Sequence, residues 1–119
     1  MSILNDSYCA FVNLNHRTDR LEHMNGQLKR IGLKASRQRG TLPNEYTGDP
    51  SKVATMRNRT PGAIGCHFSQ VEIMKDAAFM NKHAFVMEDD LIFCEDFNER
   101  IEIITEFTEN KAWDRDWET

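Results

Sequence analysis

The sequence predicts an α/β protein in which parallel strands are joined by covering helices. Two short apolar runs, at residues 8–14 and 84–87, contain the β-branched and aromatic residues typical of buried strands. Each run is followed by a segment whose apolar residues recur at helical spacing. The chain has 119 residues, so we expect a single domain over residues 1–119 with a hydrophobic core of its own.

The first strand is predicted over Tyr8 to Leu14, YCAFVNL, and the polar segment NHRTDR ends it. The helix that follows carries its apolar residues at Leu21, Met24, Leu28 and Ile31. Gly32 stands directly after the last of these and is expected to be a left-handed C-cap. Thr18 and Asp19 are expected to supply the polar groups of the helix N-terminus.

Residues 33–39 predict a short polar second strand, and residues 40–59 predict a long loop rich in turn-forming residues. A second helix is expected to begin with Thr60 as N-cap and Pro61 at its first position. Its main apolar face is expected to contain Ile64, Phe68, Val71, Met74 and Ala78, widened by Cys66, Ile73, Ala77 and Met80. So broad a face predicts a helix that is covered on two sides.

The third strand is predicted over Ala84 to Met87, directly before the carboxylates Glu88, Asp89 and Asp90. A third amphipathic helix follows, with its apolar face at Phe97, Ile101, Ile104 and Phe107. The resulting order is strand, helix, weak strand, loop, helix, strand and helix. This order is typical of a parallel sheet with helices packed against it.

Composition excludes several classes of protein. The net charge of -4 and the mixed distribution of charge argue against a basic surface for nucleic acid. No apolar run is long enough to span a bilayer and the start lacks the pattern of a secretory signal, so we expect a cytoplasmic protein. The odd number of cysteines, without CxxC spacing, argues against a disulfide framework and a structural zinc site. We expect Cys9, Cys66 and Cys94 to be buried thiols.

The carboxyl ends of parallel strands form the edge at which α/β proteins bind ligands. The predicted order brings together at that edge Asn13, Asn15 and Arg17 from the first strand and Glu88, Asp89 and Asp90 from the third. Carboxylate oxygens suit magnesium or manganese, and arginine suits phosphate, for which Arg17 and Arg20 are candidates. Because alternate residues of an extended segment share a side, Glu88 and Asp90 are expected to face one ligand while Asp89 faces away.

Three segments resemble glycosyltransferase family 25, the lipooligosaccharide and collagen galactosyltransferase group. They are CAFVNLNHRTDRLEHMNGQLKRIGL, TPGAIGCHFSQ and AFVMEDDLIF, within residues 8–97. They are similar to the NLD-R-x-DR, G-E-x-G-C-x-x-S-H and L-E-D-D motifs of that family, in the same order. The resemblance implies a GT-A type fold, a UDP-sugar donor such as UDP-galactose, and inverting transfer to a hydroxyl of a glycan, lipooligosaccharide or hydroxylysine.

The resemblance also implies roles for individual residues. The donor nucleotide would lie along Asn13, Leu14, Asn15, Arg17, Arg20, Glu88 and Asp89. Asp90 and Glu88 would hold a divalent cation, Mn²⁺ or Mg²⁺, with Asp90 the stronger candidate. No catalytic residue is assigned, because the general base is expected in a second half that longer members of the family carry. The domain is therefore expected to be truncated, with an open sheet edge that pairs with another chain as a homo-oligomer.

Three positions depart from the resembled motifs: Asn15 replaces an aspartate, Ala63 a glutamate and Gln70 a histidine. Each change removes a charge or a titratable group, so donor binding can persist while turnover falls. A second hypothesis is therefore a non-catalytic binding or assembly module. A phosphoacceptor receiver domain needs an acidic pair after the first strand, and Asn13 and Asn15 exclude it.

Each candidate residue also has a structural interpretation. The three carboxylates form an acidic turn in that reading, and the two arginines pair with Asp19 or Glu22 on the surface. Cys66 is expected to be core. His67 and Ser69 lie on different helical faces, which argues against a nucleophile and base pair.

Overall fold

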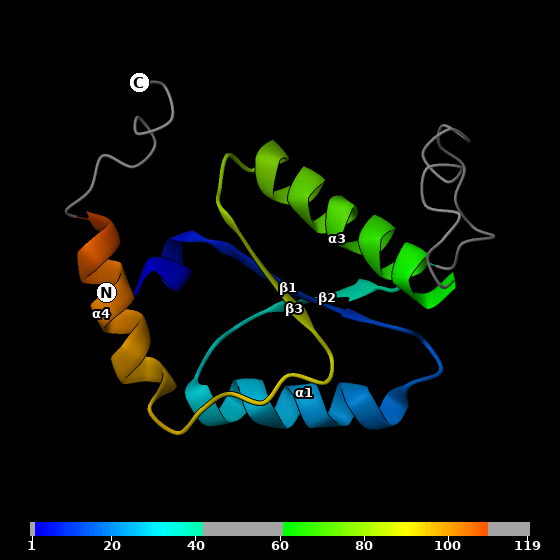
Figure 1. Ribbon diagram of the computed structural model, residues 1–119, viewed down its shortest axis with the longest axis horizontal. Helices are drawn as coiled ribbons and strands as arrows, with labels where there is room; N and C mark the ends of the chain where they lie inside the picture. Colours follow the sequence, from blue (N-terminus) through cyan, green and yellow to red (C-terminus); the bar gives the residue numbers. More distant parts are fainter. Residues whose placement is uncertain (1, 42–60, 110–119) are drawn as a thin grey trace.

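A computed structural model describes residues 2–41 and 61–109 of the chain (Figure 1). Its elements, in chain order, are the 3-10 helix η1 (Ile3–Asp6), β1 (Tyr8–Asn13), α1 (Thr18–Ile31), β2 (Ser36–Arg39), α3 (Pro61–Phe79), β3 (Ala84–Glu88) and α4 (Phe97–Glu109). The predicted order of strands and helices is confirmed. Of the predicted long loop, residues 42–59 lie outside the described residues, as do Thr60 and the side chain of Ala63.

The strands form a parallel sheet in the order β2-β1-β3, with β1 in the centre. Ala10 of β1 is in register with Ser36 of β2 and with Val86 of β3. Helices α1 and α3 lie on opposite faces of this sheet (Figure 1). The fold is therefore an α/β layered arrangement, and all three strands end at one edge.

The main core lies between the sheet and α1. Phe11 of β1 and Met87 of β3 pack there with Met24 and Leu28 of α1 and with Phe93. The apolar spacing of α1 therefore predicted its buried face correctly. Gly32 ends this helix with φ 73°, the left-handed conformation expected of a C-cap.

The N-terminus of α1 differs in detail from the prediction. The helix begins at Thr18, and the cap residue is Arg17, whose side chain makes no capping hydrogen bond. Asp19 lies in the first helical turn, where its negative charge interacts favourably with the helix dipole.

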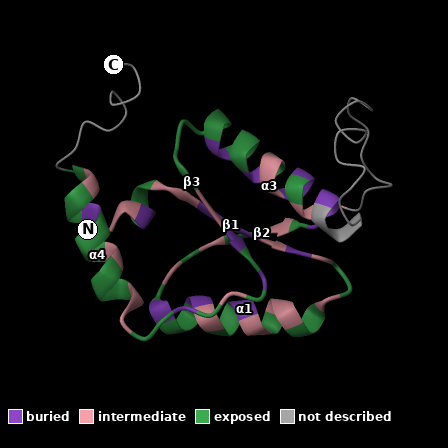
Figure 2. Cartoon of the chain, in the orientation of Figure 1, coloured by how far each residue is buried: buried purple, intermediate pink, exposed green. Residues whose placement is uncertain are grey.

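Helix α3 begins at Pro61 as predicted, and its predicted main face is only partly buried: Ile64 and Phe68 are buried, whereas Met74 and Ala78 are not. Its buried apolar residues are Ile64, Phe68, Ile73 and Ala77. Met74 is 52% exposed, and Ala78 is also exposed. Figure 2 shows that the side of α3 turned away from the sheet is largely exposed. Apolar residues surround most of this helix, so periodicity could not identify the face that packs on the sheet.

Helix α4 is also turned from its predicted orientation. Phe97 and Ile101 pack against the core, whereas Ile104 and Phe107 are exposed. The buried residue of α4 is Thr105, whose Oγ1 accepts a hydrogen bond from the Ile3 amide at 2.9 Å. The contact with η1 thus helps to set the rotation of α4. The spacing of apolar residues could not predict this rotation, because threonine is not apolar.

The cysteines occupy three different environments. Cys9 is buried, Cys66 is half-buried and Cys94 is exposed, so the prediction of three buried thiols is right only for Cys9. Within the described part of the chain, no helix is long and apolar enough to cross a membrane.

Candidate functional site

Asn13, the last residue of β1, is the centre of a polar network at the carboxyl edge of the sheet. Its side chain is 1% exposed. Its Nδ2 donates to Asp89 Oδ2 at 2.9 Å and to the carbonyl oxygen of Arg17 at 3.1 Å. Its Oδ1 accepts from Arg37 Nε at 3.0 Å. A buried amide with all these partners satisfied stabilises one arrangement of the edge.

Asp89 connects this network to α1. It is 8% exposed, and its Oδ1 accepts from Arg20 Nη1 at 3.3 Å. One carboxylate therefore joins the end of β1 to the first turns of α1. Glu88 instead contacts Cys66 of α3, so the prediction that Asp89 faces away from Glu88 is confirmed. Asp90 is exposed in the turn after β3, and the side that it faces stays a prediction.

Arg37 of β2 belongs to the same network, and the sequence did not identify it. Its Nη2 donates to the Asn13 carbonyl oxygen at 3.1 Å and to Asn15 Oδ1 at 2.7 Å. These contacts place the guanidinium across the ends of β1 and β2. The available signal was its position in a strand neighbouring β1, but the second strand was too polar and too loosely bounded to place its side chains.

The two arginines selected from the sequence have different partners. Arg17 donates from Nε and Nη2 to the two carboxylate oxygens of Asp19, each at 3.1 Å. This hydrogen bonding lowers the pKa of Asp19 to about 2. The surface pairing considered for Arg17 is therefore present, whereas Arg20 pairs with Asp89 and contributes to the network.

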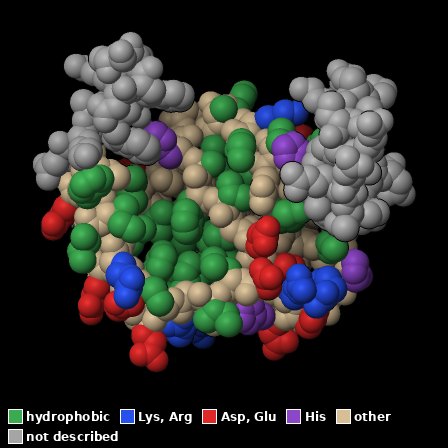
Figure 3. Space-filling model, viewed as in Figure 1, with side chains coloured by type: hydrophobic (Ala, Val, Ile, Leu, Met, Phe, Trp, Pro, Cys, Tyr) green, Lys and Arg blue, Asp and Glu red, His purple; other side chains and the backbone are tan. Residues whose placement is uncertain are grey.

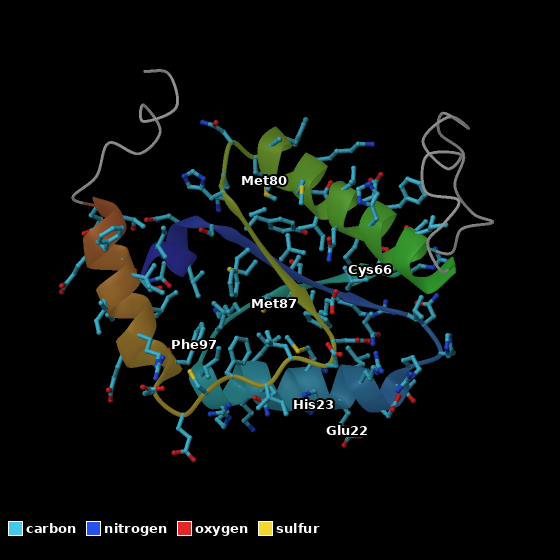
Figure 4. The ribbon with its side chains drawn as sticks, viewed as in Figure 1. Glu22, His23, Cys66, Met80, Met87 and Phe97 are labelled. Atoms are coloured by element: carbon cyan, nitrogen blue, oxygen red, sulfur yellow. The ribbon has the colours of Figure 1, made fainter. Side chains whose placement is uncertain are left out.

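Glu88 lies on the other face of the sheet, against α3. Cys66 Sγ donates to Glu88 Oε1 at 3.4 Å, and Gln70 Nε2 donates to Cys66 Sγ at 3.5 Å. Burial, followed by the hydrogen bond and charge of Glu88, raises the pKa of Cys66 to about 11. Cys66, labelled in Figure 4, is thus a half-buried thiol at the edge of the candidate site, and its predicted place in the core is wrong.

We expect Cys66 to react slowly with iodoacetamide near pH 8, because only the thiolate is nucleophilic. Its labelling rate should rise about tenfold per pH unit until the pH approaches its pKa of about 11. Mass spectrometry of the labelled peptides measures this rate, with the exposed Cys94 as the internal reference. Rapid labelling of Cys66 at pH 8 would show that Glu88 does not hold the thiol.

The segment after Asp90 is held against α1. His23, labelled in Figure 4, has its Nε2 2.9 Å from the Leu91 carbonyl oxygen. Gln27 Oε1 accepts from the Phe93 amide at 3.1 Å. Arg30 also donates to the Phe93 carbonyl oxygen. These contacts hold the chain directly after the acidic residues against α1.

Two further residues have structural roles. Leu14, which was predicted to contact the donor, is half-buried and packs beside Gly40. A Cβ added at Gly40 would lie 2.5 Å from Leu14 Cδ2, so glycine allows the Leu14 side chain to lie this close to the backbone. Ser69 is fully buried, donates to Gly65 O at 2.8 Å and accepts from the Thr41 amide at 2.7 Å. Ser69 therefore links α3 to the residues after β2. His67 is exposed, whereas Ser69 is buried, so the two do not form a nucleophile and base pair, as predicted.

The carboxylates fit one type of cation site. Magnesium and manganese commonly take one or two protein carboxylates and complete their coordination with phosphate oxygens and water. Glu88 and Asp90 offer exposed oxygens of this kind, while Asp89 is already occupied by Asn13 and Arg20. In the part of the chain that the structure describes, no three metal-ligating side chains converge. The two exposed carboxylates fit a cation that completes its coordination with a ligand and water.

A parallel sheet whose carboxyl edge carries amides, arginines and exposed carboxylates defines the class of α/β domains that bind anionic ligands at that edge. The chain belongs to glycosyltransferase family 25, described as LPS biosynthesis protein, which it matches over residues 9–118. The three-stranded parallel sheet with its flanking helices is consistent with the GT-A-like domain of this family. No curated protein and no solved structure matches the chain.

Proposed function

We propose that the carboxyl edge of this sheet binds the nucleotide-diphospho-sugar donor of a glycosyltransferase, with UDP-galactose as the first candidate. The observation that supports the proposal most is that the three consecutive carboxylates, Glu88, Asp89 and Asp90, have different surroundings. Asp89 is used internally by Asn13 and Arg20, while Glu88 and Asp90 remain exposed beside them. Family membership supplies the reaction class, transfer of a sugar from a donor to an acceptor.

In this proposal the side chains around the edge share the binding of the donor. Asn13, Leu14 and Asn15 lie along the nucleotide at the end of β1. Arg17 and Arg20, at the N-terminus of α1, provide positive charge for the diphosphate. Glu88 and Asp90 hold Mn²⁺ or Mg²⁺, which would neutralise charge on the diphosphate when bound. The acceptor is a hydroxyl of a glycan such as lipopolysaccharide.

Calorimetric titration of UDP and UDP-galactose, with and without Mn²⁺, tests the donor site. We expect Mn²⁺ to strengthen binding, and Asp90→Ala to weaken the metal-dependent binding by about tenfold or more, equivalent to about 1.4 kcal/mol. Glu95→Ala, which removes an exposed carboxylate from the turn before α4, is the matched control. Binding that is unaffected by Mn²⁺ and by Asp90→Ala would contradict the proposal.

A second candidate function is donor binding without turnover. Gln70 stands where the resembled motif carries histidine, and its amide is engaged with Cys66. A neutral amide cannot accept a proton at neutral pH as histidine does. Release of UDP from UDP-galactose, measured in the presence of Mn²⁺ and a glycan acceptor, separates a transferase from a binding module. The single domain over residues 1–119 and the cytoplasmic location stay predictions.

A further inference from the structure

The guanidinium of Arg37, an exposed residue of β2, is bonded only to neutral groups within the described part of the chain. Its Nε donates to Asn13 Oδ1 at 3.0 Å. Its Nη2 donates to the Asn13 carbonyl oxygen at 3.1 Å and to Asn15 Oδ1 at 2.7 Å. The ion pairs of the described residues do not include Arg37. Its positive charge is therefore not matched by a carboxylate there.

Arg17 and Arg20, the arginines selected from the sequence, differ from Arg37 in this respect. Arg17 forms an ion pair with Asp19, and Arg20 forms one with Asp89. Figure 3 shows acidic and basic side chains gathered over the carboxyl end of β3 and the start of α1. A negatively charged ligand would compete with a carboxylate for Arg17 or Arg20, whereas at Arg37 it would supply the opposite charge that is missing.

Arg37 and Asn15 also have hydrogen-bond donors to spare. Nε and Nη2 of Arg37 are used, and the N–H groups of Nη1 have no partner among residues 2–41 and 61–109. A guanidinium can only donate, so Asn15 must present its oxygen to Arg37, and the Nδ2 of the same amide is turned away from it. The two side chains in contact thus offer N–H groups and a positive charge, which suits an oxyanion.

The residue at position 15 decides whether this charge is available. In the motif that the segment resembles, an aspartate stands here, and a carboxylate bonded to Arg37 would neutralise it. Asn15 keeps the hydrogen bond at 2.7 Å and supplies no negative charge. The replacement therefore does more than remove a charge, because it leaves a guanidinium and an amide donor open to a ligand at the edge.

We propose that Arg37 Nη1 and Asn15 Nδ2 bind phosphate oxygens of the nucleotide-sugar donor. This inference rests on the proposed function, since it assigns the phosphate contacts of the same site. β2 lies parallel to β1 and in register with it, so Arg37 reaches the carboxyl edge where an α/β sheet binds its ligand. Asn13, which is 1% exposed, holds the guanidinium through two hydrogen bonds. Arg37 is thus oriented before the ligand arrives, which reduces the entropy lost on binding.

Calorimetric titration of the full chain tests the inference, first with inorganic pyrophosphate in the absence of divalent metal and then with UDP and Mn²⁺. Low ionic strength is used because exposed charges then interact most strongly. We expect Arg37→Gln to raise the dissociation constant of both ligands about tenfold or more, because it removes the unmatched charge. Circular dichroism and thermal unfolding check that the variant is folded.

Arg100→Gln is the matched control, because it removes the same charge from an exposed arginine that pairs with Asp96. Arg100 belongs to α4, which lies beside η1 at the other end of the sheet from the start of α1 (Figure 1). At that separation its charge is screened, so both dissociation constants should change by less than about twofold.

Asn15→Asp provides a second test that leaves Arg37 in place. An aspartate keeps the hydrogen bond to Arg37 and neutralises its charge. Pyrophosphate binding should weaken about tenfold, while the free energy of unfolding stays the same or rises. A purely structural role for Arg37 would not predict weaker binding in a variant that is at least as stable as the parent.

The outcomes separate this inference from the proposed function. UDP binding that needs Mn²⁺ and Asp90, and that neither Arg37→Gln nor Asn15→Asp weakens, would overturn the inference and leave the donor site intact. Binding of UDP and pyrophosphate that depends on Arg37 but not on Mn²⁺ or Asp90 would support the phosphate contacts and contradict the proposed function. Failure of the folded parent chain to bind either ligand would overturn both.

Discussion

Replacing Asp89 with alanine is expected to lower the free energy of unfolding by about 2–3 kcal/mol. Asp89 is 8% exposed, and its carboxylate accepts hydrogen bonds from Asn13 and Arg20. Its removal leaves the buried Asn13 Nδ2 with one acceptor fewer and Arg20 without its carboxylate. The Arg20 side chain is 41% exposed and can turn toward water, so the loss should lie below that of a fully buried ion pair. Urea denaturation measures the change.

Asp90→Ala is the matched control for this prediction, because it removes the neighbouring carboxylate from an exposed position. Its effect on unfolding should be within about 0.5 kcal/mol, while its effect on metal-dependent nucleotide binding should be large. The two variants thus separate the structural carboxylate from the proposed ligand. Equal destabilisation by both substitutions would show that the Asn13–Asp89–Arg20 network does not support the fold.

The position of the site could be predicted from the sequence, because it follows from the topology alone. Parallel strands end at one edge, so Asn13 and the Glu88–Asp90 segment had to lie near one another once the order of elements was known. Alternation along the third strand also predicted that Glu88 and Asp89 would point to opposite faces, and Glu88 contacts α3 while Asp89 contacts Asn13 and Arg20. These inferences depend only on chain direction and on the period of a strand, and both survive errors in helix orientation.

The contacts of those residues could not be predicted, because they depend on how the helices are rotated. Arg20 reaches Asp89 only because α1 packs with Met24 and Leu28 toward the sheet. Arg37 comes from a strand whose burial pattern gives no sequence signal, and Cys66 meets Glu88 through the rotation of α3. The spacing of apolar residues could not predict either rotation, because apolar residues surround most of α3 and the buried residue of α4 is a threonine.

The network also explains how a strand can end in three carboxylates without a large energetic penalty. Asp89 is buried but is matched by a guanidinium and an amide, whereas Asp90 remains in water. Glu88 is exposed and accepts from a thiol that stays protonated. A ligand at the edge would therefore meet the exposed carboxylates of Glu88 and Asp90, while Asp89 stays engaged with Asn13 and Arg20.

Asn13→Asp is expected to destabilise the fold by about 3 kcal/mol at neutral pH, although the two side chains have nearly the same shape. The substitution replaces the Nδ2 donor with an oxygen facing Asp89 Oδ2, at the 2.9 Å contact, and facing the Arg17 carbonyl oxygen. Arg37 can compensate one of the two negative charges through its Nε. The repulsion between adjacent buried carboxylates remains, and it raises the pKa of one member of the pair.

The pH dependence of this variant identifies the cause. A carboxyl with a raised pKa in the folded state binds a proton more tightly there than in the unfolded chain, so the deficit should shrink as the pH falls below about 5. Asn15→Asp is the control, because Asn15 is exposed and its Oδ1 accepts from Arg37, a bond that a carboxylate can keep. It should be neutral or slightly stabilising at pH 7. An Asn13→Asp deficit that is independent of pH would mean that lost packing, and not the charge facing Asp89, weakens the fold.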